Sequence, residues 1–475
     1  MSAKKKKDDR HHELVAKKLP LAEVEVGRAV QLDLFENLVV SDKYSRTAEV
    51  YDAIPRFVGI RQHGARISGR FLDPHNQDFV AKRKAYDPDT GQLRNKAFNY
   101  SFELTPARIR RKDKTTQEES YVDCFPGKRE EQVEDALRFF STQPGRSCLI
   151  NNHVAVRFTL RELQNELKRH KHTYALDELR EAIEIMATSI MDIKEEGGAS
   201  LKSPLFPLRW VPDRDEWLKA SGDCHCYVCF HPLITKSVME LGARQLFYEI
   251  AMQLKSPIAV WLLKKMSHYY IYASPSKSYD ILLTSIVRDY GLKKTMRFRD
   301  QKRLVMDAIE ELGLKKIISC PEPNMVFGGV RGTKLEDVYF ELFATEEFGN
   351  AMREANARHK QLLAREEAME ILSDLMRQIA LASRPRLDFT SGGPPRKVSS
   401  GFFLSDDQLR GLEEEVVKVV KKHFDENKID TACGGFFSTV KTRIIALAKQ
   451  KYGVTIEPDD LILNVCQNQN NQVEG

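Results

Sequence analysis

The sequence has 475 residues, of which 42% are hydrophobic and 30% are charged. This is an ordinary balance for a globular protein of about three domains. Its 74 Lys and Arg residues against 68 Asp and Glu give a formal net charge of +6, a mildly basic total that permits a nucleic-acid partner without requiring one. No apolar run is long enough for a transmembrane helix, the basic N-terminus lacks the apolar core of a secretory signal, and eight Cys are too few for a disulfide scaffold. We therefore expect a cytoplasmic protein without membrane contact.

Residues 1–50 are predicted to form a disordered basic tail, since residues 4–18 hold seven basic side chains against three acidic ones and no periodicity appears before Ala29. Within it stands the pentapeptide QLDLF, formed by Gln31, Leu32, Asp33, Leu34 and Phe35. A short apolar motif in a disordered segment contributes little to folding, but its Leu and Phe anchors suit a preformed apolar pocket on a partner. The alternative is that QLDLF is the first strand of the following domain.

Residues 51–235 show the pattern of a winged-helix domain. Strands are predicted at 98–104 and 121–125, a helix at 129–141 and a strand at 154–158. Thr159 and Glu162 have the spacing of a capping box, which predicts that a helix begins there. A helix at 174–191 and strands at 205–210 and 226–230 complete the order.

A second winged-helix domain is predicted over residues 236–345. Helices are expected at 237–251, 257–266, 279–290 and 297–312, and strands at 316–320 and 338–343 flank a basic, glycine-rich loop. A long helix at 346–384, a linker at 385–401 and a helical module at 402–475 follow. The predicted fold class is therefore α+β, with two tandem winged-helix domains ahead of a long helix and a small helical C-terminal module.

The helix at 297–312 has the two faces that a DNA-reading helix needs. Phe298, Val305, Ile309 and Leu312 fall on one side, and Arg299 and Arg303 fall together on the other. Long basic side chains in front of an apolar back suit guanine edges and phosphates in a major groove. The alternative is a solvated charged helix. The predicted DNA contacts are Lys293, Lys294, Arg297, Arg299, Lys302 and Arg303, with Arg331 and Lys334 in the wing and Lys168, Arg169 and Lys171 in the turn of the first domain.

The corresponding helix of the first domain is acidic. Asp177, Glu178, Glu181 and Glu184 outnumber Arg180 there, and such a face repels phosphate. We therefore expect unequal roles, with the second domain as the main DNA reader and the first serving mainly for protein contact.

No catalytic constellation stands out, so a binding protein without a cofactor is expected rather than an enzyme. The segment Cys224–His231, CHCYVCFH, crowds three Cys and two His into eight residues. A zinc site needs a second ligand pair at longer spacing, and on a strand Cys224 and Cys226 share a face that Cys229 does not. A buried strand is favoured over a metal site.

The QLDLF motif, the helices RFTLRELQNELKRH and ALDELREAIEIMATSIM, the segment LKSPIAVWLLKKMSHYY and the basic helix RFRDQKRLVMDAIEELGL together resemble the TrfA-type replication initiators of broad-host-range plasmids. The resemblance covers about residues 29–345, and the clamp-type pentapeptide, which is QLSLF in that family, is its most specific part. It implies a bacterial protein that binds repeated origin DNA (iterons), opens the origin, and recruits the sliding clamp, the host initiator and the replicative helicase. It also implies an exchange between monomer and dimer that takes part in plasmid copy control. The rival hypothesis is a winged-helix transcriptional regulator without a replication role, for which a clamp motif has no use.

Overall fold

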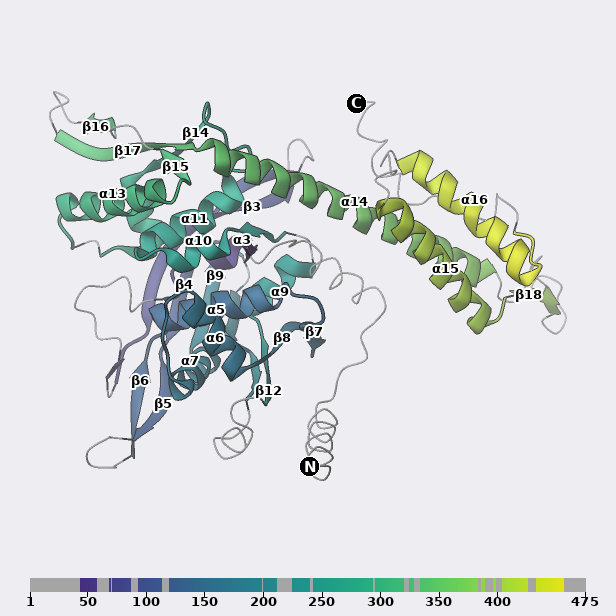
Figure 1. The fold of residues 1–475 in the computed structure, drawn as a ribbon, viewed down its shortest axis with the longest axis horizontal. Coiled ribbons are helices and arrows are strands. Elements are labelled where there is room, and N and C mark those ends of the chain that lie inside the picture. Colours follow the sequence, from purple (N-terminus) through teal and green to yellow (C-terminus); the bar gives the residue numbers. More distant parts are fainter. Residues whose placement is uncertain are drawn as a thin grey trace. The chain divides into compact units, whose positions relative to one another are not determined.

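The structure is a computed structural model that describes residues 43–57, 68–69, 71–86, 93–112, 119–198, 200–211, 224–239, 242–293, 295–319, 324–328, 334–382, 386–388, 396–398, 404–425 and 433–456. The chain forms two compact units, Met1–His359 and Lys360–Gly475, which are described separately below (Figure 1).

The first half of unit 1 has the predicted order of helices and strands. The elements that follow this order are α5 (Lys128–Phe140), β7 (Ser147–Ile150), β8 (His153–Thr159), α6 (Leu160–Arg169), α7 (Leu176–Thr188), β11 (Leu208–Trp210) and β12 (His225–Cys229). Their strands form a sheet in the order β11-β12-β8-β7. The predicted capping box is confirmed: the Glu162 N–H donates to Thr159 Oγ1 at 3.1 Å, and the Thr159 N–H donates to Glu162 Oε2 at 2.8 Å. Leu163 and Leu167 of α6 then pack into the core.

A second sheet, in the order β10-β9-β4-β3, interrupts this pattern. Its strands are β3 (His75–Tyr86), β4 (Leu93–Thr105), β9 (Ile190–Glu195) and β10 (Ser200–Pro204). The helix predicted to reach residue 191 ends at Thr188, because Ile190 and Met191 pair with Thr105 and Leu104 of β4. A separate sheet, β2-β6-β5, contains β2 (Ser68–Gly69), β5 (Ala107–Lys112) and β6 (Glu119–Cys124).

The second half of unit 1 contains two corrections to the predicted helices. The stretch expected as one helix at 237–251 comprises the end of α9 (Pro232–Met239), then β13 (Arg244–Leu246) and the start of α10 (Tyr248–Gln253). The helix expected at 279–290 is mostly replaced by β14 (Ser278–Leu282), a short α12 (Leu283–Ile286) and a π-helical turn, η1 (Val287–Gly291). The reason is tertiary: β13 pairs with β1 (Ser45–Thr47), and β14 pairs with β17 (Lys334–Ala344).

The remaining elements of this half follow the prediction closely. Helix α11 (Pro257–Tyr269) begins after Ser256, whose hydroxyl accepts from the Ala259 N–H at 3.4 Å, and α13 (Phe298–Leu314) covers the predicted basic helix. The sheet runs β14-β17-β15, where β15 is Ile318–Ser319, and β16 (Asn324–Gly328) also pairs with β17.

The predicted tail extends too far at its C-terminal end. Ser45, Arg46 and Thr47 form β1 and are at most 3% exposed, and α3 (Glu49–Ala53) follows directly. The predicted domain boundary at 235/236 also lies inside α9.

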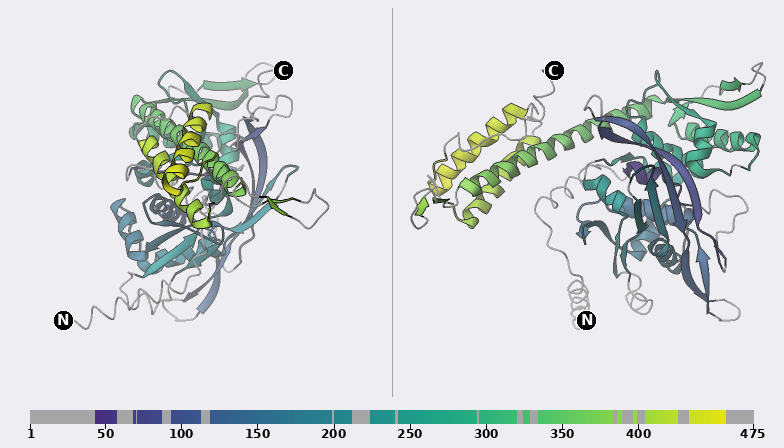
Figure 2. Two further views of the ribbon diagram at one scale, coloured as in Figure 1. Left: turned by 90° about the vertical axis from the view of Figure 1, so that its right-hand side faces the viewer. Right: turned by 180° about the vertical axis from the view of Figure 1, so that it is seen from behind.

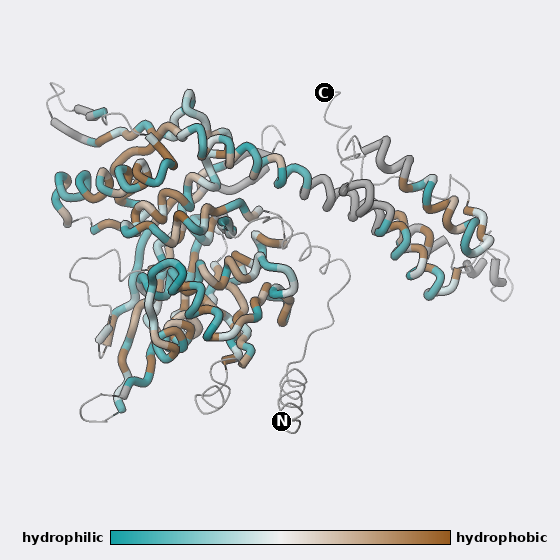
Figure 3. The backbone as a smooth tube through the Cα atoms, in the orientation of Figure 1, coloured by the Kyte–Doolittle hydropathy of each residue, from teal (hydrophilic) through white to brown (hydrophobic). Residues whose placement is uncertain are grey.

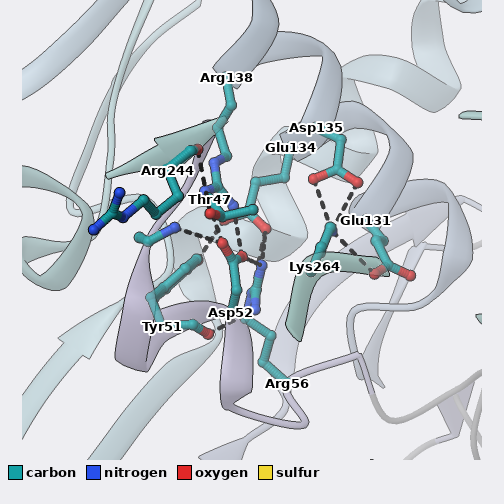
Figure 4. A network of polar contacts seen from close by, with 11 residues as sticks. Thr47, Tyr51, Asp52, Arg56, Glu131, Glu134, Asp135, Arg138, Arg244 and Lys264 are labelled. Atoms are coloured by element: carbon teal, nitrogen blue, oxygen red, sulfur yellow. Dashed lines mark hydrogen bonds and ion pairs between the residues drawn. The ribbon is translucent and has the colours of Figure 1, made fainter. Parts of the chain in front are cut away.

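Buried charges join the two halves of unit 1 (Figure 4). Lys264 of α11 places Nζ 2.8 Å from both carboxylate oxygens of Asp135 on α5. Beside this pair, Asp52 of α3 accepts from Arg138 Nη1 at 2.7 Å, and Glu134 accepts from Arg56 Nη2 at 2.7 Å. Buried charges are tolerated only when paired in this way.

Unit 2 is a helical assembly that contains the end of the predicted long helix together with helices of the predicted C-terminal module. Its core joins the C-terminal part of α14 (Glu346–Ala382) to α15 (Asp406–Asp425) and α16 (Cys433–Tyr452), through residues such as Ile379, Val416 and Ile444. Ser405 precedes α15 and accepts from the Gln408 N–H at 3.3 Å. The predicted linker contains one strand pair, β18 (Arg386–Asp388) with β19 (Arg396–Val398). In the part of the chain that the structure describes, no helix has the length and apolarity needed to cross a membrane.

Candidate nucleic-acid interface

Helix α13 is amphipathic, with its apolar face in the core of the second half of unit 1. Val305, Ile309 and Leu312 are 0–4% exposed, whereas Phe298 is partly buried against the same cluster. The tube in Figure 3 alternates between hydrophilic and hydrophobic residues along this helix. The predicted apolar face is therefore confirmed.

Polar contacts fix the position of α13. The carboxylate of Glu311 accepts hydrogen bonds from the backbone N–H groups of Lys255 at 2.7 Å and Ser256 at 2.8 Å, at the N-terminus of α11. At the other end of α13, Gln301 is 7% exposed and donates from Nε2 to the Lys293 carbonyl oxygen at 3.1 Å. The helix is thus held at both ends before any ligand binds.

The opposite face of α13 presents basic side chains to solvent. Arg297 is the N-cap residue, and Arg297, Arg299 and Arg303 are exposed, whereas Lys302 is half-buried. Arg303 lies 3.7 Å from Asp300, but its side chain is 70% exposed. An exposed ion pair at this distance contributes little, so the guanidinium remains available to a ligand.

Of the other DNA contacts predicted in this domain, only Lys293 and Lys334 lie among the described residues. Lys293 is half-buried just after η1, and Lys294 lies outside the described residues. Lys334 begins β17, where it pairs with Gly328 of β16, so it stands at the base of the predicted wing. Arg331 and the rest of the wing tip lie outside the described residues.

The acidic face of α7 is matched by arginines of its own domain. Glu181 accepts from Arg111 of β5 at 2.7 Å and from Arg129 of α5 at 3.0 Å, and Glu184 pairs with Arg209 of β11 at 2.5 Å. Burial raises the pKa of Glu181, but the hydrogen bonds from the two arginines outweigh it and hold the pKa below its usual range. In α7, the helix that corresponds to α13, these carboxylates are therefore engaged in contacts within the protein.

In the basic turn of the first domain, Arg169 forms ion pairs, whereas Lys168 and Lys171 are exposed. Arg169 pairs with Glu166 at 2.9 Å and with Glu249 at 3.2 Å, which links α6 to α10. Burial raises the pKa of Glu166, but hydrogen bonds from His170, Arg169 and Tyr248 outweigh it and lower that pKa to about 2. Lys168 and Lys171 are exposed, and Lys171 has a positive φ of 65°.

The cysteine segment lies on β12, as a strand interpretation requires. Cys226 and Cys229 are 1% and 0% exposed, and burial raises the pKa of both thiols to about 12. Among the described residues there is no group of three or more His, Cys, Asp or Glu side chains placed to hold a metal ion. The QLDLF motif, residues 31–35, lies outside the described residues.

Sequence reasoning predicted β4 as a strand at 98–104 but missed β3, its hairpin with β4, and the contact of β3 with the segment before α13. Figure 2 (right) shows this hairpin passing beside the helices of the second half of unit 1. Gln77 Nε2 donates to the Arg288 carbonyl oxygen at 2.8 Å. Gly291 has a φ of +88°, which favours glycine, and a Cβ there would lie 2.1 Å from Gln77 Oε1, so the Gln77 side chain would have to shift. The signal available in the sequence was a glycine between a predicted helix and a basic turn.

No protein-family model matches the chain, and no curated protein matches its sequence. Among solved structures, the chain is similar to a SeMet derivative of domains 2 and 3 of RctB, with 9% identity, 62% of this chain and 96% of that chain covered, and a TM-score of 0.35. It is also similar to the Pi initiator protein in complex with iteron DNA, with 14% identity, 46% and 91% coverage, and a TM-score of 0.31. A second structure of RctB domains 2–3 gives 10% identity, 58% and 94% coverage, and a TM-score of 0.32.

Proposed function

We propose that this chain is a plasmid replication initiator that binds repeated origin DNA and acts without catalysis. The observation that carries the proposal is α13: its apolar face is locked into a core, and Arg297, Arg299 and Arg303 are exposed on its other side. A rigid helix with free guanidinium groups is what direct reading of guanine edges in a major groove requires.

Both halves of unit 1 are proposed to be winged-helix domains. In the second half, α11, β14, α12 with η1, α13, β16 and β17 follow the order of that fold, and β17 lies between β14 and β15 in the sheet. In the first half, α5, β8, α6, α7, β11 and β12 follow the same order, and the hairpin of β9 and β10 is inserted after α7. The β16–β17 connection then acts as the wing that meets the phosphate backbone.

The two halves are proposed to act unequally. The second half reads bases through α13, because its basic side chains are exposed. In the first half, the exposed Lys168 and Lys171 are the proposed phosphate contacts, and Arg169, which Glu166 and Glu249 hold, contributes less. The carboxylates of α7 favour a structural or protein-binding role.

The remaining steps rest on the resemblance to TrfA-type initiators. QLDLF is proposed to bind the bacterial sliding clamp, and bound chains are proposed to open the origin and recruit the host initiator and replicative helicase. A dimer would be the silent form. This role places the protein in the bacterial cytoplasm.

Nuclease footprinting on the DNA that flanks the gene tests the proposal. We expect protection of direct repeats spaced by whole helical turns, since a tandem reader on one face of the duplex requires this phasing. The matched control is the Arg299→Ala/Arg303→Ala protein on the same DNA, which should give no footprint. Protection of a single palindrome by a chain that does not bind the clamp would instead establish the transcriptional regulator.

A further inference from the structure

The sheet β2-β6-β5 of unit 1 has one buried face and one exposed face. On the buried face, Ala107 and Ile109 of β5 pack against Ile185 of α7. Side chains alternate along a strand, so Arg108 and Arg110 of β5 lie on the opposite face, where both are exposed. The proposed DNA contacts include no residue of this sheet.

Two large aromatic side chains are exposed on the same face as these arginines. Phe71, which follows β2, is 72% exposed, and Tyr121 of β6 is 56% exposed. Tyr121 lies directly opposite Arg110 in the register of β5 and β6, so the two side chains share a face. Exposed apolar side chains that gather in one place, unlike scattered ones, mark an interaction site.

The guanidinium of Arg108 lies within reach of both rings. Its central carbon is 5.4 Å from the ring centroid of Phe71 and 5.5 Å from that of Tyr121. Within the described part of the chain this guanidinium has no hydrogen-bond or ion-pair partner. Its charge is therefore held in place by aromatic contacts alone and remains accessible to an anion.

The charges near Arg108 leave this face open to an anion. Arg110 pairs with Glu119, but the two side chains are 64% and 42% exposed, and an exposed pair of this kind contributes little. Asp123 lies opposite Arg108 but is buried and accepts a hydrogen bond from the Leu72 N–H at 3.0 Å. On this face of β5 and β6, the exposed charges of the described residues are two arginines and one carboxylate.

We propose that this aromatic face, formed by Phe71, Arg108, Arg110 and Tyr121, binds single-stranded DNA. Unpaired bases stack on the two exposed rings, and the two arginines contact the phosphates that connect these bases. A duplex does not fit this surface, because the faces of its bases are covered by their neighbours in the stack.

The position of the hairpin favours DNA as the nucleic acid. Figure 1 shows β5 and β6 at the same side of unit 1 as α13, the proposed reading helix. A strand that is unpaired beside bound origin duplex therefore has a short path to the aromatic face. The choice of DNA over RNA rests on the proposed function, whereas the stacking site itself does not.

Fluorescence anisotropy of the full chain with a labelled oligothymidylate of about 16 nucleotides tests the proposal. We expect saturable binding, and Phe71→Ala/Tyr121→Ala should weaken it at least about tenfold because both stacking platforms are lost. Phe71→Trp/Tyr121→Trp should retain binding, since a larger ring still stacks. Arg108→Gln should reduce the magnitude of the salt slope by about 0.7, the value for one phosphate of a single strand.

Two controls separate stacking from general attraction to phosphate. Tyr272→Ala removes another exposed ring with a cation beside it, Lys277 Nζ at 5.8 Å from its centroid, and should leave binding unchanged. An abasic strand of the same length keeps the phosphates but lacks the bases, so the parent protein should bind it at least about tenfold more weakly.

Four results would overturn the proposal: no saturable binding of oligothymidylate, equal affinity for the abasic strand, equal weakening by Tyr272→Ala, or unchanged binding in Phe71→Ala/Tyr121→Ala. Tighter binding of an oligouridylate of the same length would show that the occupant is RNA and would overturn the assignment to DNA.

Oligothymidylate contains no origin repeat, so this proposal and the proposed function fail separately. Arg299→Ala/Arg303→Ala should lose the footprint on the repeats and keep oligothymidylate binding. Phe71→Ala/Tyr121→Ala should keep the footprint and lose oligothymidylate binding. Loss of both activities in both variants would indicate one shared surface and would contradict a separate site for the single strand.

Discussion

The carboxylate of Asp289 accepts a hydrogen bond from the backbone N–H of Val80 at 3.2 Å, although the two residues are 209 positions apart. Val80 lies on β3, the edge strand of its sheet, and Asp289 lies in η1, just before the turn into α13. Lys265 holds the other oxygen of Asp289 at 2.8 Å. A hairpin of the first half is thereby tied to the base of the proposed reading helix.

Asp289→Ala should loosen this connection. It removes an acceptor that Lys265, Arg288 and the Val80 N–H share, in a part of the protein where Asp289 is 4% exposed, so we expect a loss of about 2–4 kcal/mol in the free energy of unfolding. DNA affinity should fall while the salt slope stays unchanged, because no phosphate contact is removed. Asp73→Ala, at an exposed position, is the control. An unfolding free energy within about 0.5 kcal/mol of the parent would contradict this role.

Helices α13 and α7 should respond differently to substitution. Arg299→Ala and Arg303→Ala should each cost about 1–3 kcal/mol in binding to the cognate repeat and relax base preference. Glu181→Ala should leave DNA affinity nearly unchanged and lower stability instead, since it removes the acceptor that Arg111 and Arg129 share. Fluorescence anisotropy combined with urea unfolding separates these effects. Equal affinity losses from α13 and α7 would refute the asymmetry.

The salt dependence of DNA binding should show whether the predicted wing, the loop between β16 and β17, contacts DNA. If six to eight phosphates are contacted, the plot of log K against log[salt] should have a slope of roughly −5 to −7. Lys334→Ala should reduce its magnitude by about one and weaken iteron and random duplexes alike, because a lysine at the backbone reads no base edge. If both slopes are unaffected, the loop between β16 and β17 is not a DNA-contacting wing.

Clamp binding should depend on the N-terminal motif alone. Replacing both Leu34 and Phe35 with Ala removes two apolar anchors, each worth about 1.5–3 kcal/mol, and should weaken clamp binding at least about 100-fold. Duplex binding should be unchanged. Titration of the purified clamp checks the first expectation and anisotropy the second, and an unaltered clamp affinity would exclude this motif as the binding site.

Stability should fall on mild acidification because two histidines are buried in the neutral form. Burial lowers the pKa of His231 and of His268 to about 3, whereas in the unfolded chain the value is about 6.5. The unfolded chain therefore binds more protons between these values, so this stability is fully present above pH 6.5 and is lost as pH falls toward 3, by about 1.4 kcal/mol per pH unit for each histidine.

The variant His231→Asn tests this directly. It retains an acceptor for the Leu233 N–H, which now donates to His231 Nδ1 at 3.2 Å, but it cannot titrate. Urea unfolding between pH 7 and 5 should show a mean slope smaller by about 1 kcal/mol per pH unit than in the parent, because the unfolded histidine titrates within this interval. An unchanged slope would mean that His231 is not neutral in the folded protein.

Local periodicity alone determined much of this protein. It was sufficient for α5, α6, α11 and α13, for the Thr159 capping box, and for the split of α13 into an apolar and a basic face, because each depends on residues within a few positions of one another. The separation of strands from helices at 237–251 and 279–290 depended instead on pairing with β1 and β17, which are distant in sequence.

Tertiary structure also determined which charged side chains are paired and withdrawn from solvent. The acidic residues of α5 and α7 have the pattern of a solvated face, yet Asp135 is buried against Lys264 and Glu181 is half-buried against two arginines. The pairing that makes their burial tolerable comes from other elements of the fold, and no local pattern specifies it.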